Sequence, residues 1–190
     1  MNEVKEAPRR AVFLDRDGVL NLPVLRDGKP FPPASRAQLE ISPGAPEALA
    51  ALREAGFLLY VVTNQPDVAR GVQTQAGVEE IHRAMREMLP VDGFYICYHD
   101  DRDHCACRKP KPGMLLAAAA EHGISLDESF LVGDRWRDVE AGQRAGVRTV
   151  WLDSGYQERA PATTPDARVT SIGEAAAWIL REAHNRRLRQ

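Results

Sequence analysis

Two carboxylates follow a short apolar run near the start of the chain. Asp15 and Asp17, followed by Gly18, come directly after Ala11–Leu14. Residues at positions i and i+2 can bring one carboxylate and one backbone carbonyl to a common cation, while the glycine permits a tight turn. The same pattern is typical of an acidic surface turn, and it does not fit a calcium loop, whose first ligand position would fall on Phe13. A cation site at the end of a strand is the functional interpretation.

A second pair of carboxylates repeats this arrangement further along the chain. Asp134 and Asp138 follow the apolar run Phe130–Val132 and Gly133. Taken alone, the pair is equally compatible with a helix cap and turn. Its position after a second predicted strand nevertheless allows both pairs to meet at one edge of a sheet.

Two more polar segments complete a set that could act on phosphate. Thr63 and Asn64 follow the run Leu58–Val62, and Arg108 and Lys109 precede a predicted helix. A hydroxyl and free backbone N–H groups can hold phosphate oxygens, and a lysine can neutralise developing charge, although a helix cap and a solvated face are the structural alternatives. Together with the carboxylates, these groups supply what phosphoryl transfer needs.

All three cysteines of the chain lie within eleven positions, in the pattern Cys97-x-His99-x5-Cys105-x-Cys107. Three thiolates and one imidazole form a closed tetrahedral set, which is typical of a structural zinc site. His104 is the competing imidazole, but it adjoins a cysteine and breaks the symmetric spacing. We expect Zn²⁺ in this loop, where it would fix the adjacent Arg-Lys pair, and we expect a reducing, cytoplasmic compartment.

The order of the motifs resembles the haloacid dehalogenase (HAD) superfamily of phosphatases over residues 11 to 152. The matching residues are Asp15-x-Asp17, Thr63, Lys109 and Gly133-Asp134-x-x-x-Asp138. The resemblance implies a Rossmann-like fold, Mg²⁺ dependence and an aspartyl-phosphate intermediate.

The resemblance also implies a role for each residue of the catalytic motifs. Asp15 would attack phosphorus, while Asp17 would protonate the leaving oxygen and later activate water. Thr63 and the Asn64 backbone would hold the phosphoryl group, and Lys109 would stabilise its charge.

The same resemblance assigns the Mg²⁺ ligands. They would be the Asp15 carboxylate, the Asp17 backbone carbonyl and the Asp134 carboxylate, with Asp138 beside these ligands rather than on the ion.

Longer segments narrow the resemblance. The chain is similar to the bacterial D-glycero-D-manno-heptose 1,7-bisphosphate phosphatases and to the histidinol-phosphate phosphatases. The segments that carry this similarity are FLDRDGVLN, VTNQ followed by ARG, CRKPKPGM and VGD. In the heptose enzymes a residue corresponding to Arg108 helps to read the substrate. The chain departs from the pattern at Pro66-Asp67, where Ser-Gly is usual, and at Arg135, where Lys is common. The proline-rich segment Leu22–Arg36 is longer than expected and forms a candidate substrate wall.

We expect removal of the 7-phosphate of the heptose bisphosphate, and several alternatives remain open. A histidinol phosphate or another small phosphosugar could be the substrate. Removal of a 3′-phosphate from a polynucleotide is disfavoured, because the net charge is −2 and aromatic residues make up only 6% of the chain. An alternative of a different class is a non-catalytic zinc-binding interaction module.

The pattern of elements predicts a three-layer α/β fold, with a parallel sheet covered by helices on both faces. The predicted strands are Ala11–Leu14, Leu58–Thr63, Phe94–Tyr98, Phe130–Val132 and Thr149–Leu152. The predicted helices are Ala45–Ala55, Thr74–Leu89, Pro112–His122, Asp138–Arg144 and Gly173–His184. A helix, a strand and the zinc loop 97–107 fill the stretch between Thr63 and Lys109, so no large cap domain is expected.

Length and composition indicate one domain over residues 1–190. The chain has 25 Lys and Arg against 27 Asp and Glu and is 44% hydrophobic, which is enough apolar content for a substantial core. Its apolar runs are too short for a membrane span. We therefore expect a monomer that acts on a small phosphorylated substrate, without membrane or nucleic-acid partners.

Overall fold

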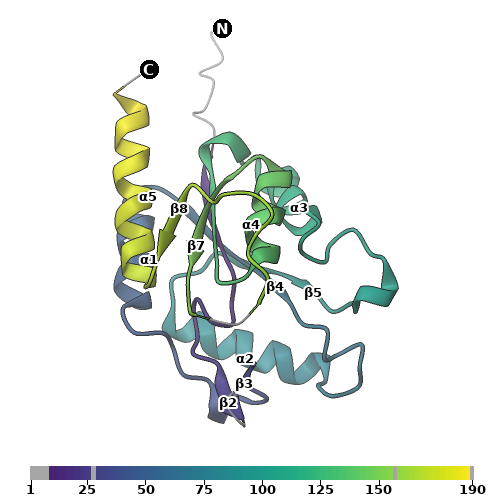
Figure 1. Cartoon of the computed structure of the whole chain (residues 1–190). Coiled ribbons are helices and arrows are strands. Elements are labelled where there is room, and N and C mark those ends of the chain that lie inside the picture. The colour runs from purple at the N-terminus through teal and green to yellow at the C-terminus, as the bar shows by residue number, and fades with distance from the viewer. Residues whose placement is uncertain (1–8, 27–28, 156–157, 189–190) are drawn as a thin grey trace, which may run out of the picture.

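A six-stranded parallel sheet forms the centre of the computed structural model, which describes residues 9–26, 29–155 and 158–188 (Figure 1). The strand order is β5-β4-β1-β6-β7-β8. The strands are β1 (Ala11–Leu14), β4 (Leu58–Asn64), β5 (Gly93–Cys97), β6 (Phe130–Gly133), β7 (Arg148–Leu152) and β8 (Ala167–Val169). All neighbouring strands in this order pair in parallel, as the alternation of strands and helices predicts.

Helices cover both faces of this sheet. They are α1 (Ala45–Glu54), α2 (Gln75–Met88), α3 (Gly113–His122), α4 (Trp136–Ala145) and α5 (Ile172–Arg187). Val12 and Leu14 of β1 pack with α1, α2 and α5, whereas Ala11 and Phe13 pack with α3 and α4. Side chains alternate between the faces of a strand, so a strand covered on both faces is apolar throughout. The predicted three-layer Rossmann-like fold is confirmed.

The helix α2 begins where the sequence predicts, and its buried face is as predicted except for one residue. The Thr74 side chain caps the helix by accepting a hydrogen bond from the Gly77 N–H at 3.1 Å. Met85 is buried, but Met88, which the helical period also assigns to the core, is 52% exposed. The prediction for Met88 is wrong because this residue lies at the last position of the helix, where the chain turns away toward β5.

The proline-rich segment is more ordered than predicted. Within Leu22–Arg36, β2 (Val24–Arg26) and β3 (Lys29–Phe31) form an antiparallel hairpin, which is drawn below α2 in the view of Figure 1. Proline is tolerated in such a hairpin, because a strand at the edge of a sheet does not need every backbone N–H for pairing. Three short 3-10 helices lie in other connections: η1 (Arg36–Gln38), η2 (Asp101–Asp103) and η3 (Leu126–Glu128).

The topology determines where a site can form. From β1 the chain first adds β4 and β5 on one side, and then returns to add β6, β7 and β8 on the other. In open α/β sheets, ligands bind at the carboxyl ends of the strands where the order reverses, which here is the end of β1. Between β4 and β5 the fully described chain contains α2 and its connections, without an inserted cap domain.

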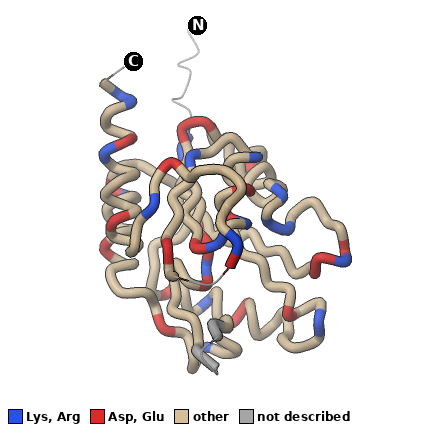
Figure 2. The backbone as a smooth tube through the Cα atoms, viewed as in Figure 1, with Lys and Arg blue, Asp and Glu red and all other residues tan. Residues whose placement is uncertain are grey.

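Charged residues are interspersed over the elements rather than gathered by sign, as Figure 2 shows for one view. This distribution agrees with the near-neutral net charge. No helix in the described part of the chain combines the length and apolar character needed to cross a membrane.

Candidate active site

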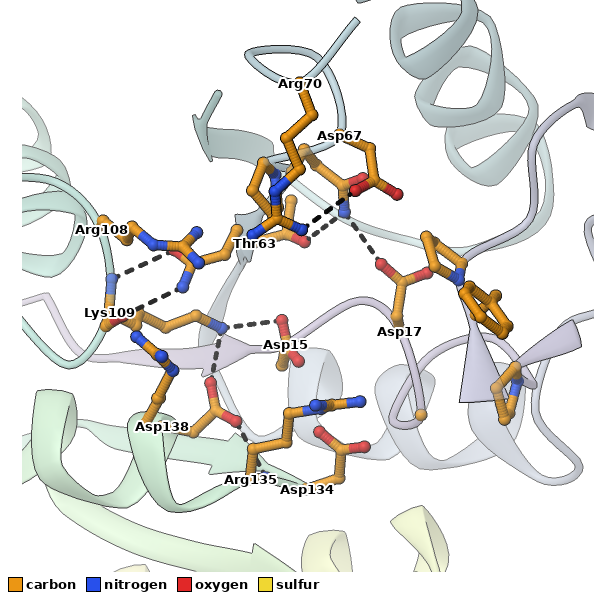
Figure 3. Close-up of a pocket in the computed structure, with 18 residues that line it drawn as sticks. Asp15, Asp17, Thr63, Asp67, Arg70, Arg108, Lys109, Asp134, Arg135 and Asp138 are labelled. Carbon is orange, nitrogen blue, oxygen red and sulfur yellow. Dashed lines mark hydrogen bonds and ion pairs between the residues drawn. The ribbon is translucent and has the colours of Figure 1, made fainter. Parts of the chain in front are cut away.

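Lys109 meets two carboxylates where the ends of β1 and β6 and the start of α4 come together (Figure 3). Its Nζ donates to Asp15 Oδ1 at 2.7 Å and to the Val62 carbonyl at 2.8 Å, and it forms an ion pair with Asp138 Oδ1 at 2.5 Å. Burial would lower the pKa of Lys109, but the charges of Asp138 and Asp15 outweigh it and raise the pKa. The lysine therefore remains an ammonium ion in the interior.

Asp15, Asp134 and Asp138 form a group whose ligand oxygens lie within 4.8 Å of one another. Together with Lys109 they are called the carboxylate cluster below. Burial raises the pKa of Asp15 to about 6 against the opposing charge of Lys109, and burial and the Asp15 charge raise the pKa of Asp134 well above its usual value. Asp134 Oδ1 is buried and has no hydrogen-bond partner among the described residues. Three carboxylates against one lysine leave an excess of negative charge that suits a hard divalent cation.

Asp138 has two functions in the structure. Its Oδ2 accepts a hydrogen bond from the Arg135 N–H at 3.0 Å and caps α4, while its Oδ1 meets Lys109. The helix cap and the site, which the sequence presents as alternatives, are thus both present. Gly133 allows this approach, because a Cβ at that position would lie 2.1 Å from the Cβ of Asp138.

Asn64 anchors the segment that carries the lysine. Its side-chain Oδ1 accepts from the Lys109 N–H and its Nδ2 donates to the Lys109 carbonyl, both at 3.1 Å. This function of the Asn64 side chain is additional to the one predicted for its backbone. It could not be read from the sequence, because the two residues are far apart in the chain.

Asp17 lies on the opposite side of Asp15 from Lys109 in Figure 3, and hydrogen bonds from Gln65 link it to Thr63. Gln65 Nε2 donates to Thr63 Oγ1 at 2.8 Å and to Asp17 Oδ2 at 2.9 Å. Because Thr63 accepts this hydrogen bond, its own O–H is available to donate to a phosphate oxygen. Asp17 is outside the three-carboxylate group, and Gly18 makes the predicted turn with φ of 86°.

The site opens into a cavity of about 280 Å³, which is edged by arginines. Arg70, Arg108 and Arg137 line it and are called the arginine rim below. Asp101 Oδ1 accepts from Arg108 Nε at 2.7 Å and from Arg137 Nη1 at 3.1 Å, and Asp100 accepts from Arg70 at 2.9 and 3.0 Å. Arg108 is predicted from the sequence, whereas Arg70 and Arg137 are not, because isolated arginines on loops and helix starts resemble an ordinary solvated surface.

The hairpin forms another wall of this cavity. Pro23, Phe31 and Pro32 line it, as do Pro66 and Asp67, which replace the usual Ser-Gly. The expectation that the proline-rich segment faces the site is confirmed. Arg135, the other departure from the family pattern, also lines the cavity, so all of these differences lie around the same space.

The four predicted zinc ligands come together in one loop. Cys97, His99, Cys105 and Cys107 each offer a ligand atom within 4.8 Å of the others, and the three Sγ–Sγ distances are 3.1, 3.4 and 3.6 Å. His99 Nδ1 is 3.3 Å from Cys107 Sγ. All three cysteines are free thiols and His104 is outside the group, so the arrangement has the ligand types and closeness of a structural zinc site.

Comparisons with known proteins agree with this geometry. Residues 106–175 match the HAD-hydrolase-like family model. A relative from Helicobacter pylori is 36% identical over 90% of this chain and 97% of its own length, and one from Rhodopseudomonas palustris is 38% identical over 74% and 82%. Both are named D-glycero-beta-D-manno-heptose-1,7-bisphosphate 7-phosphatase.

A solved structure extends the similarity to the fold. The D,D-heptose 1,7-bisphosphate phosphatase from B. bronchiseptica, complexed with magnesium and phosphate, matches with a TM-score of 0.77 at 31% identity. The match covers 92% of this chain and 99% of that protein. The chain therefore belongs to the HAD-like hydrolases, within the group of phosphatases that includes the heptose bisphosphate phosphatases.

Proposed function

We propose that this phosphatase removes the 7-phosphate of D-glycero-D-manno-heptose 1,7-bisphosphate through a phosphorylated Asp15. The observation that carries the chemistry is the contact of Asp15 with Lys109 inside the carboxylate cluster, at the switch point of the sheet. Relatives named for this substrate and the arginine rim support the choice of substrate.

The reaction divides into two steps. In the first, an Asp15 oxygen attacks phosphorus, the bond from phosphorus to the 7-oxygen breaks, and the leaving oxygen takes a proton from Asp17. In the second, water attacks phosphorus and gives a proton to Asp17, while the bond from phosphorus to Asp15 breaks and phosphate leaves. Thr63 and the Asn64 backbone hold the phosphoryl oxygens, and Lys109 balances their charge.

The residues at the end of β1 fit Mg²⁺. Asp15, Asp134 and the Asp17 backbone carbonyl would hold it. Support comes from Asp134 Oδ1, which is buried without a hydrogen-bond partner among the described residues, whereas both Asp138 oxygens are engaged. When bound, the ion supplies charge that offsets a repulsion of about 4 kcal/mol between two like charges 4 Å apart at an effective dielectric of about 20.

The Cys97, His99, Cys105 and Cys107 loop fits a structural Zn²⁺. The closed set of four ligands supports this assignment, and so does its position next to the segment that carries Lys109. Metal analysis of the purified protein should find about one zinc per chain. Fully active protein without zinc would contradict a structural role for the ion.

The arginine rim supports a substrate with a second anionic group. Guanidinium groups bind phosphate through paired hydrogen bonds, and the aspartates behind Arg70, Arg108 and Arg137 hold them at the cavity. The cysteines are free thiols, which supports our proposal that the enzyme acts in the reducing cytoplasm. The expected monomer stays a prediction.

Phosphate release tests the substrate. The panel contains both anomers of the heptose 1,7-bisphosphate, histidinol phosphate, other sugar phosphates and 3′-phosphorylated DNA, each with Mg²⁺. We expect the highest kcat/KM for one heptose anomer. A higher value for histidinol phosphate or for DNA, or equal values across the panel, would contradict the proposed substrate.

A further inference from the structure

A second buried cation lies between the two aspartates of the first motif. The Arg16 side chain is fully buried, and a buried guanidinium is stable only when its donors are matched. Its Nε and Nη2 donate to both carboxylate oxygens of Asp17 at distances of 2.8 to 3.1 Å. This paired contact fixes the plane of the carboxylate as well as its position.

Two neutral side chains complete the surroundings of this guanidinium. Arg16 Nη2 also donates to Gln65 Oε1 at 3.1 Å, and Nη1 lies 3.1 Å from His82 Nε2. Because arginine can only donate, His82 accepts through Nε2 and is neutral. The His82 ring is buried on α2 and stacks on Phe94 with 4.4 Å between ring centroids. The ring therefore contacts Nη1, the one guanidinium nitrogen for which no hydrogen bond to Asp17 is present.

The same contacts link Asp17 to the phosphate-binding side of the site. Gln65 accepts from Arg16 through Oε1 and donates through Nε2 to both Asp17 and Thr63. Asn21 Nδ2 donates to the other Asp17 oxygen at 3.2 Å. The position of the Asp17 carboxylate is thus set relative to the Thr63 hydroxyl.

We propose that Arg16, supported by His82, is the positioning residue that holds the Asp17 carboxylate ready to take a proton from water. The inference rests on the proposed function, because it concerns the hydrolysis of phosphorylated Asp15. Asp15 and Asp17 are only two positions apart, yet Asp17 is outside the three-carboxylate group and contacts Arg16 instead. The contact with Arg16 thereby keeps Asp17 available for proton transfer, while Asp15 stays in the three-carboxylate group that fits the cation.

Hydrolysis of p-nitrophenyl phosphate with Mg²⁺ tests this inference. p-Nitrophenolate leaves without a proton, so phosphorylation of Asp15 stays fast when Asp17 is misplaced, and the second step becomes slower. The variants are Arg16→Lys, which keeps the charge but loses the paired contact, and His82→Gln. The matched control is His122→Gln, whose ring stacks on Tyr60 away from the cavity.

We expect Arg16→Lys to lower kcat by about 100-fold, the cost of misplacing a group that transfers a proton. Because only the second step is slowed, KM should fall together with kcat, and kcat/KM should stay unchanged. His82→Gln should lower kcat less. Both variants should release a burst of about one equivalent of p-nitrophenolate before slow turnover. The control His122→Gln should turn over like the wild type, with no burst. Thermal unfolding followed by circular dichroism gives the folded fraction, and His82→Gln alone decides the test if Arg16→Lys does not fold.

Wild-type turnover per folded molecule in both variants, or a loss without a burst, would contradict the inference. Asp17→Asn distinguishes this failure from a failure of the proposed function. Arrest of Asp17→Asn after a burst, combined with unaffected Arg16 and His82 variants, would contradict the positioning role alone. Full turnover by Asp17→Asn would contradict the proposed mechanism itself.

Discussion

The carboxylate cluster and the arginine rim face the same cavity but differ in how they are held. The side chains of Lys109 and Asp138 are 3% and 2% exposed, and the cluster lies at strand ends and a helix start. On the rim, the side chains of Arg70 and Arg137 are 42% and 30% exposed, whereas that of Arg108 is 11% exposed, and aspartates of the zinc loop and η2 hold all three. Charges interact strongly in the buried cluster and are screened at the rim. Chemistry is therefore expected to depend on the cluster, and selection of the substrate on the rim.

The largest effect is expected from removing the nucleophile. Asp15→Asn should lower kcat by at least about 10⁴-fold, because the amide cannot form the phosphorylated intermediate. Folding should be retained, since the change removes a charge from a cluster with excess negative charge. Phosphate release and thermal unfolding measure the two effects. Undiminished activity in this variant would exclude the mechanism.

Removing the Asn64 side chain, which anchors the segment that carries Lys109, should have the next largest effect. Asn64→Ala removes two hydrogen bonds to the backbone of Lys109, so we expect kcat to fall by up to about 100-fold with a small change in KM. Asn185→Ala on the exposed side of α5 is the matched control. A change confined to KM would show that Asn64 acts on substrate binding instead.

A substitution on the arginine rim should change KM rather than kcat, the opposite of the pattern expected for Asn64→Ala. Arg137→Ala should raise KM for the heptose bisphosphate by about tenfold, or about 1.4 kcal/mol, the scale of one hydrogen bond to a charged group. The KM for p-nitrophenyl phosphate should not change, since that substrate has no second anionic group. Arg181→Ala on α5 serves as the control. An equal loss for both substrates would remove the distinction between the rim and the cluster.

The last effect concerns stability and depends on His82. Burial, with the Arg16 charge, lowers the pKa of His82 to about 3; Arg86 acts in the same direction and Asp17 opposes it. An unfolded histidine has a pKa of about 6.5, so below this pH the unfolded state binds one more proton than the folded state. The free energy of unfolding should then fall with decreasing pH by up to about 1.4 kcal/mol per pH unit.

A comparison with His82→Gln removes the contribution of the buried carboxylates, which is common to both proteins. Urea unfolding between pH 7 and 5 should show the wild type losing its stability advantage over the variant as the pH falls. A difference between the two proteins that does not change with pH would contradict the assignment of a neutral, buried imidazole.

The sequence predicts the residues of the carboxylate cluster better than the residues that hold the cluster in place. The apolar runs before Asp15, Thr63 and Asp134 predict three strands. Because parallel strands end at a common edge of the sheet, these residues are expected to lie close together. The contact between Asn64 and the Lys109 backbone depends on residues far apart in the chain and on how the end of β4 packs against the loop that carries Lys109. No local pattern reports such a contact.

Arg16 illustrates a second limit, because a charge beside two acidic residues resembles a solvated turn until the position of α2 is known. Its one sequence signal is its place after a fully buried strand, where a long charged side chain must find partners. The hairpin inside Leu22–Arg36 was missed for a different reason. Its prolines argue against a central strand, but they are tolerated in an isolated pair of strands.

The most direct test of the account is to identify the residue that carries the phosphoryl group. Enzyme mixed with Mg²⁺ and the heptose bisphosphate is quenched in acid within one turnover, and its peptides are analysed by mass spectrometry. We expect phosphate on the peptide that contains Asp15, in wild type and not in Asp15→Asn. Turnover with no phosphorylated peptide, or with phosphate on another residue, would contradict it.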